Sequence, residues 1–218
     1  MLGNILFPPK CVFCRKLLSR QEPDLCHSCR EHAPEVTHVK KQIPFIAQWT
    51  AMWYYKDDVR KSIHRFKFGN ARRYADVYAR HLAIKLTECG IAECFDILSW
   101  IPVSPLRKFL RGYDQAYLLA AALGKELDCE PAPVVRRTKH TKPQSSLRDA
   151  AMRRANIHGV YTAQDCSRIE GKRILLIDDV VTTGATSSEC ARILMTAGAK
   201  EVFLAAIATA NHNNKQNR

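Results

Sequence analysis

The chain has 218 residues, of which 46% are hydrophobic, and this excludes a chain that is disordered throughout. Such a length suits one α/β domain with a small additional unit. The formal net charge of +13 favours polyanionic partners, namely nucleic acid, phosphorylated small molecules or an anionic membrane surface, although a protein with one basic face would also carry it.

The sequence has no stretch that approaches the ~20 apolar residues of a membrane span. The first ten residues lack the charged segment and the long apolar run of a secretory signal peptide. We therefore expect a cytoplasmic protein without a membrane span. In that reducing compartment its nine cysteines should be thiols or metal ligands rather than disulfides.

Two C-x-x-C motifs near the start predict a metal site. Cys11 and Cys14 form the first motif, and Cys26 and Cys29 form the second. At this separation four thiolates can meet at one tetrahedral ion, and Zn²⁺ is the usual occupant. His27 lies inside the second motif, but four cysteines already complete the shell. Residues 1–42 are therefore expected to form a small unit whose folding depends on the metal.

Residues 43–210 alternate between apolar strand patterns and amphipathic helix patterns. We expect Asp57 and Asp58 to cap the first of these helices and Gly69 to end it. A basic stretch from residue 136 to residue 158 has little apolar periodicity, and the polar tail at 211–218 is expected to be disordered. In chain order the predicted elements are a strand at 49–55, helices at 57–68 and 72–88, a strand at 95–103, a helix at 113–127, strands at 134–135 and 174–177, a helix at 185–197, and a strand at 201–208.

This alternation predicts a doubly wound parallel sheet flanked by helices. The strand at 174–177 is entirely apolar, which is typical of a central strand covered on both faces. In such sheets ligands bind at the carboxyl ends of the strands. The residues that follow residue 177 are therefore the first place to look for a site.

That segment combines groups suited to a phosphorylated sugar. Asp178 and Asp179 follow the strand directly and can accept hydrogen bonds from sugar hydroxyls. A Thr-Thr-Gly turn then leads into a helix, whose first amide groups can bind a phosphate. A phosphate at one end and hydroxyls at the other describe a ribose 5-phosphate. The residues expected to hold the phosphate are Thr182, Thr183, Gly184, Ala185 and Thr186.

A purely structural alternative exists for this segment. In it the threonines merely cap the next helix and one aspartate is exposed. Two acids directly after a fully apolar strand are hard to explain in this way, because unpaired carboxylates near a core are costly.

The stretch 174–184 resembles the 5-phosphoribosyl-1-pyrophosphate (PRPP) motif of type I phosphoribosyltransferases. Further segments resemble the ComF/GntX family, whose members are bacterial competence and DNA-utilisation proteins with an N-terminal zinc ribbon on a phosphoribosyltransferase domain. The resemblance covers nearly the whole chain in order. The segments that carry it are 66–69, 101–106, 111–115, 141–147 and 153–156.

The resemblance implies a fold and a set of roles. A type I phosphoribosyltransferase-like sheet would occupy residues 43–210, behind a zinc ribbon in residues 1–42. Asp178 and Asp179 would act as the ribose-binding, catalytic acids. A loop at residues 103–112 would meet pyrophosphate through Arg107, Lys108 and Arg111, with Mg²⁺ bridging its oxygens. Residues 139–156 would form a loop over the ligand. Many relatives carry more cysteine pairs than the four ribbon cysteines here, so a second zinc is not expected.

Three functions remain open at this stage. The first is a protein of natural transformation that handles single-stranded DNA and binds PRPP, which the family resemblance and the charge favour. The second is an active phosphoribosyltransferase that joins ribose 5-phosphate to a nucleobase-like acceptor. The third is an interaction role, in which the ribbon docks on a DNA-uptake helicase or another competence protein. We favour the first, with the basic and aromatic stretch 53–74 as one candidate DNA contact.

Overall fold

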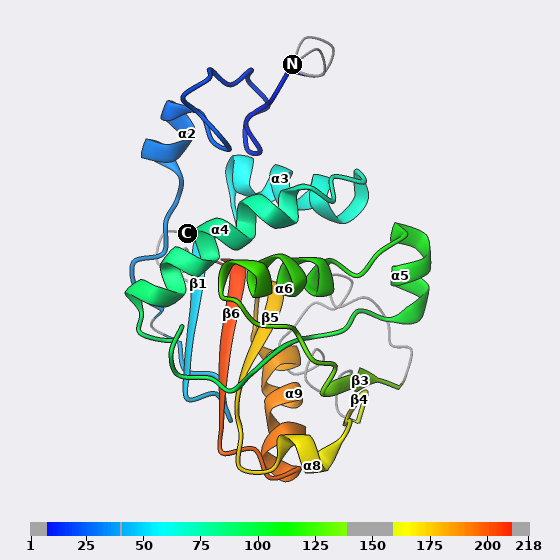
Figure 1. Cartoon of the computed structure of the whole chain (residues 1–218). Coiled ribbons are helices and arrows are strands. Elements are labelled where there is room, and N and C mark those ends of the chain that lie inside the picture. The colour runs from blue at the N-terminus through cyan, green and yellow to red at the C-terminus, as the bar shows by residue number, and fades with distance from the viewer. Residues whose placement is uncertain (1–7, 40, 139–158, 211–218) are drawn as a thin grey trace, which may run out of the picture.

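The protein is described by a computed structural model, which covers residues 8–39, 41–138 and 159–210 (Figure 1). The predicted disordered tail at 211–218 lies outside the described residues. Residues 139–156, which the family resemblance assigns to a loop over the ligand, also lie outside the described residues.

Four parallel strands form the central sheet, in the order β1 (Gln48–Tyr54), β6 (Glu201–Thr209), β5 (Arg173–Val181) and β2 (Ile97–Trp100). The middle strands β5 and β6 are almost continuously buried, which explains their unbroken apolar sequences. The predicted fold class, a parallel sheet flanked by helices, is confirmed.

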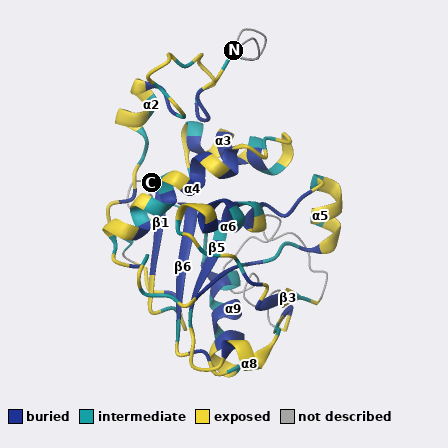
Figure 2. Ribbon diagram, in the orientation of Figure 1, coloured by how far each residue is buried: buried dark blue, intermediate teal, exposed yellow. Residues whose placement is uncertain are grey.

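Helices cover both faces of this sheet (Figures 1 and 2). On one face α4 (Tyr74–Glu88) and α6 (Gln115–Glu126) pack against the strands, and α3 (Asp57–Phe68) shares their hydrophobic core. The other face is covered by α9 (Ala185–Thr196), which packs in a second core. The alternating residues of β5 divide between these cores. Leu175 and Ile177 face the first, whereas Ile174 and Leu176 face the second.

Shorter elements lie around the sheet. A two-stranded antiparallel ribbon, β3 (Val135–Arg137) and β4 (Tyr161–Ala163), stands apart from the parallel strands. The remaining short helices are α2 (His27–His32), α5 (Pro105–Arg111) and α8 (Cys166–Ile169). Both α2 and α5 are largely exposed in Figure 2.

Two local expectations from the sequence are wrong. Residues 103–112, expected to be a loop, contain α5, because the Ser104 hydroxyl accepts from the Arg107 amide and Pro105 occupies the first turn. Asp57 and Asp58 do not cap α3 with their side chains. They lie in its first turn, where a negative charge is favourable to the helix dipole.

The cysteine-rich segment packs directly on α3 and α4. The Arg65 guanidinium donates to the carbonyls of Val12 and Phe13, at 2.7 Å each. The Phe13 ring meets Trp53 edge-on, with centroids 5.0 Å apart. The buried residues of this segment, among them Val12 and Phe13, belong to the same core cluster as the buried residues of α3 and α4, so the segment is attached by core contacts. Its division from the rest of the chain at residues 42 and 43 stays a prediction.

Candidate functional site

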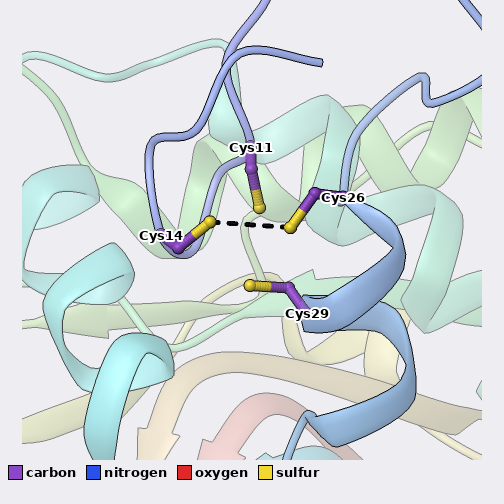
Figure 3. A group of neighbouring side chains, drawn as sticks. All are labelled: Cys11, Cys14, Cys26 and Cys29. Carbon is purple, nitrogen blue, oxygen red and sulfur yellow. Dashed lines mark hydrogen bonds between the residues drawn. The ribbon is translucent and has the colours of Figure 1, made fainter. Parts of the chain in front are cut away.

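The four motif cysteines come together in space. Their sulfur atoms all lie within 4.8 Å of one another, and Cys14 Sγ is 3.6 Å from Cys26 Sγ (Figure 3). Four Zn–S bonds of about 2.3 Å in a tetrahedron place the sulfurs about 3.8 Å apart. The thiols therefore fit one tetrahedral zinc ion.

Local backbone structure shapes this cluster. Arg15 has a φ of 71° and its amide donates to the Cys11 carbonyl, which closes a tight knuckle around the first pair. The second pair brackets the start of α2, where the Arg30 amide donates to the Cys26 carbonyl. His27 is highly exposed and pairs with Glu31 at 3.2 Å, outside the cluster, as the sequence analysis expected.

Burial makes two of the thiols harder to ionise. Desolvation, followed by the neighbouring thiols of Cys14 and Cys26, raises the pKa of Cys29, and desolvation also raises the pKa of Cys14. The pKa of Cys11 is lowered, because backbone hydrogen bonds outweigh its desolvation. Zinc binds thiolates, so a bound ion would offset this penalty and link metal binding to folding.

The second site lies at the carboxyl end of β5. This strand runs to Val181 rather than ending at Ile177, so Asp178 and Asp179 lie within it and not after it. Successive side chains of a strand point to opposite faces. The two acids therefore continue the alternation of the apolar residues before them, Asp178 on the α9 face and Asp179 on the α3 and α6 face.

Asp179 is gathered into a group of basic side chains. Its Oδ1 lies 2.8 Å from the Nζ of Lys67, at the end of α3, and both side chains are largely buried. Arg107 and Arg111, from α5, also lie close enough for attraction to Asp179 to act on their pKa values. Burial lowers the pKa of both guanidinium groups. Neither arginine forms an ion pair with an acid among the described residues. Partly desolvated cations of this kind are suited to an anionic ligand.

Asp178 is in a different environment. Desolvation, then the charge of Asp179, raises the pKa of Asp178 to about 8, although Lys67 acts in the opposite direction. Its Oδ1 accepts from the Asp179 amide at 2.8 Å. On its own face Asp178 lies near Cys190 and Tyr161. Desolvation, and then the charge of Asp178, raises the pKa of Cys190. Desolvation, then Cys190, raises the pKa of Tyr161, and Asp178 adds to this effect. Asp178 is therefore held in its neutral form more readily than an ordinary aspartate.

The turn after β5 brings the start of α9 to the same edge of the sheet. Gly184, the N-cap residue of α9, has a φ of 75° and no side chain to cap the helix, and the Thr183 hydroxyl accepts from the Ala185 amide at 3.4 Å. The amide groups at the start of an α-helix have no acceptors within the helix, and they carry a positive partial charge. The predicted residues 182–186 therefore lie where a phosphate could be bound, next to the predicted acids.

Residues at the junction between the cysteine-rich segment and the rest of the chain contact this turn. Lys41 Nζ donates to the Thr183 carbonyl, and Trp49 fixes Lys41 by donating to its carbonyl at 2.7 Å. A Cβ placed on Gly184 would lie 3.0 Å from Ile43, so the turn is packed tightly here.

Residues 112–115 hold the elements around the site in place. Gly112 ends α5 with a φ of 75°, and the Tyr113 hydroxyl donates to the Phe66 carbonyl. Asp114 caps α6 by accepting from the Tyr117 amide at 3.2 Å, and its other oxygen accepts from the Val103 amide at 3.1 Å. These bonds fix α5 and its arginines relative to α3.

Of the predicted binding residues, Arg107, Arg111 and Asp179 come together, and Lys108 is exposed on α5. The sequence analysis missed Lys67 as a site residue. Its segment 66–69 contributed to the family resemblance, but nothing local indicates that its ammonium reaches Asp179, which is 112 positions later in the chain. Lys41 was missed for the same reason.

Comparison with known proteins adds evidence to this geometry. The profile of the phosphoribosyl transferase domain matches residues 114–218, and that of the double zinc ribbon domain matches residues 2–39. Competence protein F of Haemophilus influenzae is 28% identical, over 92% of this chain and 97% of that protein. The chain is thus similar over most of its length to competence and DNA utilisation proteins, and this confirms its resemblance to the ComF/GntX family.

Further relatives align over similar lengths. The DNA utilization protein YhgH of Escherichia coli K12 is 27% identical, over 88% of this chain and 86% of that protein. Competence protein ComFC of Bacillus subtilis is 25% identical, over 86% of this chain and 78% of that protein. The ribbon match and the cysteine cluster together support a structural zinc ion. Residues 2–39 contain four cysteines, enough for one tetrahedral set.

None of the described helices combines the length and the hydrophobicity that crossing a bilayer requires.

Proposed function

We propose that this protein handles single-stranded DNA in DNA uptake or utilisation and binds PRPP through its phosphoribosyl transferase domain. The observation that carries the PRPP part is the meeting of two features at one sheet edge. The acid pair of β5 and the start of α9 suit a ribose 5-phosphate. Arg107 and Arg111 stand beside Asp179, where they could meet the pyrophosphate.

A magnesium ion would accompany this ligand. Mg²⁺ commonly binds substrate phosphates together with one or two carboxylates and keeps several of its waters. We propose that it bridges the pyrophosphate oxygens at this edge of the sheet.

An apolar ledge beside the site supports the DNA part of the proposal. The ledge consists of four exposed apolar side chains, Phe68 at the end of α3 and Leu106, Phe109 and Leu110 on α5. The Arg111 guanidinium lies 4.6 Å from the centre of the Phe68 ring. Exposed aromatic rings and arginines are the groups on which unpaired bases stack. By contrast, Trp53, Phe66 and Tyr74 from the predicted aromatic stretch are buried in the core.

Two titrations of the zinc-loaded protein test this proposal. Calorimetry with PRPP and Mg²⁺ should give binding of one ligand per chain. Fluorescence anisotropy with a labelled oligothymidylate should give an affinity that falls steeply as salt is raised. Absence of PRPP binding, or absence of oligonucleotide binding at low salt, would refute the corresponding half of the proposal.

A matched pair of variants locates the DNA contact. Phe109 on α5 and Ile84 on α4 are both exposed apolar residues, with 84% and 59% exposure. Phe109→Ala should weaken oligonucleotide binding by about 1–3 kcal/mol, the usual loss for one stacking contact. Ile84→Ala should leave the affinity unchanged. Equal affinities for the two variants would show that DNA does not use the ledge.

A second candidate function is transfer of ribose 5-phosphate from PRPP to a nucleobase-like acceptor. The desolvated Arg107 and Arg111 beside Asp179 favour it, because cations positioned on the leaving pyrophosphate stabilise charge that develops as the bond breaks. Release of pyrophosphate on addition of a base, lost in Asp179→Asn, would support it.

A further inference from the structure

An ion pair joins α3 to the site, and neither the family resemblance nor the packing of α3 accounts for it. Lys67 Nζ lies 2.8 Å from Asp179 Oδ1, with side chains that are 18% and 12% exposed. The other lysine of this helix, Lys61, keeps its ammonium group in solvent near a neighbouring acid. Lys67 instead directs its charge into the molecule, because Gly69 ends the helix beside the site.

Acids as well as bases surround Asp179, and a close cation offsets the repulsion between these acids. Asp178 adjoins it in β5, and the buried Asp114 at the start of α6 is near enough to interact. The charged groups opposite are Lys67 from α3 and Arg107 and Arg111 from α5. Among these cations, Lys67 alone is within 4 Å of the carboxylate in the described part of the chain.

The pair engages one oxygen of Asp179 and leaves the other available. Oδ1 meets Lys67, and no bond to Oδ2 is formed by the described residues. A carboxylate accepts hydrogen bonds at both oxygens. The second oxygen can therefore accept from a ligand hydroxyl while the first stays fixed.

We propose that Lys67 is a positioning residue of the ribose site, which holds the Asp179 carboxylate in place to accept a ribose hydroxyl. This inference rests on the proposed binding of PRPP. It gives a role to the Phe66-Lys67-Phe68-Gly69 segment that the sequence resemblance left without one.

Calorimetry with PRPP and Mg²⁺ tests this role in three variants. Lys67→Met should weaken binding by about tenfold or more at neutral pH, since a charged hydrogen bond is worth about 1.5–3 kcal/mol. Lys67→Arg should keep most of the affinity, and Lys61→Met should match the wild-type protein.

The outcomes separate this inference from the proposed function. Wild-type protein that fails to bind PRPP would refute both. Wild-type protein and Lys67→Met with equal affinities would refute the role of Lys67 alone. If Lys67→Met does not fold, as judged by circular dichroism and zinc content, Lys67→Gln provides the same comparison with a polar side chain.

A different set of contacts links the zinc site to the same helix. The carbonyls of Val12 and Phe13 lie inside the first C-x-x-C motif, and both accept from the guanidinium of Arg65. Ser62 also donates to the Val12 carbonyl, at 2.5 Å. Arg65 is two positions before Lys67, so one turn of α3 holds the knuckle at one end and Asp179 at the other.

We infer that zinc binding and PRPP binding are coupled through α3. A zinc-loaded knuckle fixes Val12 and Phe13, these fix Arg65, and the helix then presents Lys67 to Asp179. Coupling of two binding sites is reciprocal, so bound PRPP must raise the affinity for zinc.

Chelator competition measures this coupling without depending on catalysis. Saturating PRPP should raise the zinc affinity of the wild-type protein by about fivefold or more, the lower end of typical coupling. Arg65→Met should abolish the increase, while Arg60→Met, an exposed change on the same helix, should keep it. If Arg65→Met does not fold, Ser62→Ala provides the second test. Equal zinc affinities with and without bound PRPP in the wild-type protein would refute the coupling.

Discussion

Asp178 and Asp179 are neighbours in β5, but their carboxyl groups enter different surroundings. Asp179 meets Lys67 at 2.8 Å on the side of α3, whereas Asp178 faces the side of α9, near Cys190 and Tyr161. One acid is therefore paired with a cation, and the other is held toward its neutral form by desolvation. The two acids should respond differently to substitution.

The raised pKa of Asp178 predicts that the stability of the protein depends on pH. A carboxyl group whose pKa is raised on folding destabilises the protein when it ionises. Its pKa rises to about 8, so wild-type stability should fall as pH increases from about 5 to that value. Asp178→Asn cannot ionise and should lose this decline. It should exceed the wild type by about 1 kcal/mol or more at the alkaline end, since one pKa unit is worth about 1.4 kcal/mol.

Urea unfolding at several pH values measures this effect. Asp179→Asn is the contrasting variant, because it leaves the largely buried Lys67 without its partner and should destabilise the protein at neutral pH. The account of Asp178 would be wrong if Asp178→Asn and the wild type showed parallel stability profiles.

Gly184 offers a test of the phosphate turn. Its φ of 75° is strained for an alanine, and the added Cβ would lie 3.0 Å from Ile43. Gly171 has a similar φ of 69° but has open space around it. Gly171→Ala should cost about 1 kcal/mol of stability from backbone strain alone. Gly184→Ala should cost about 1 kcal/mol more because of overpacking, and it should also weaken PRPP binding.

A double-mutant cycle isolates the contact. In an Ile43→Ala background the extra cost of Gly184→Ala should fall to the level seen for Gly171→Ala. Thermal unfolding of the four proteins provides the comparison. An extra cost that persists without the Ile43 side chain would place its origin elsewhere.

The ribbon should bind one zinc ion per chain. The family profile describes a double ribbon, but residues 2–39 contain four cysteines, which complete one tetrahedral shell. Metal analysis of protein prepared with excess zinc should therefore give one ion per chain. Cys29→Ser should lose the ion, whereas Cys166→Ser, an exposed cysteine outside the cluster, should keep it. Two tightly bound ions in the wild type would contradict this arrangement.

An ion pair at the opposite end of the sheet makes a stability prediction in acid. Arg173 donates through its backbone amide and its guanidinium to Asp96, and these bonds lower the pKa of Asp96 to about 2. A lowered pKa stabilises the fold above the unfolded value and loses that contribution as pH falls through the folded value. At pH 7 Asp96→Asn should cost about 1 kcal/mol after allowance for solvent screening.

The stability difference between wild type and Asp96→Asn should shrink as pH falls from about 4 toward 2. Denaturant titrations in acid provide the measurement. A constant difference across that range would show that the charge of Asp96 is not the source of the stabilisation.

Local patterns in the sequence were enough to predict much of this molecule. The spacing of Cys11, Cys14, Cys26 and Cys29 indicated a four-thiol cluster, because tetrahedral coordination imposes that geometry. The unbroken apolar run before Asp178 indicated a central strand, because parallel strands are covered on both faces. The predicted helix at 57–68 is α3, in which the buried Val59, Ile63 and Phe66 follow the helical period.

Features that depend on distant parts of the chain were not predicted. The extension of β5 past Ile177 comes from pairing with β6, whose register continues to Thr209. That pairing, and not the local sequence, places the two acids on opposite faces. Likewise Lys67 reaches Asp179 only because α3 ends at this edge of the sheet. The short helix α5 was missed although Ser104 and Pro105 form a recognisable helix start.

A crystal structure of the zinc-loaded protein with PRPP and Mg²⁺ tests the central claim most directly. The account predicts the 5-phosphate at the amino-terminal end of α9, a ribose hydroxyl on Asp179, and pyrophosphate toward Arg107 and Arg111. Density for PRPP at another surface, or no density at this edge of the sheet at saturating concentration, would contradict it.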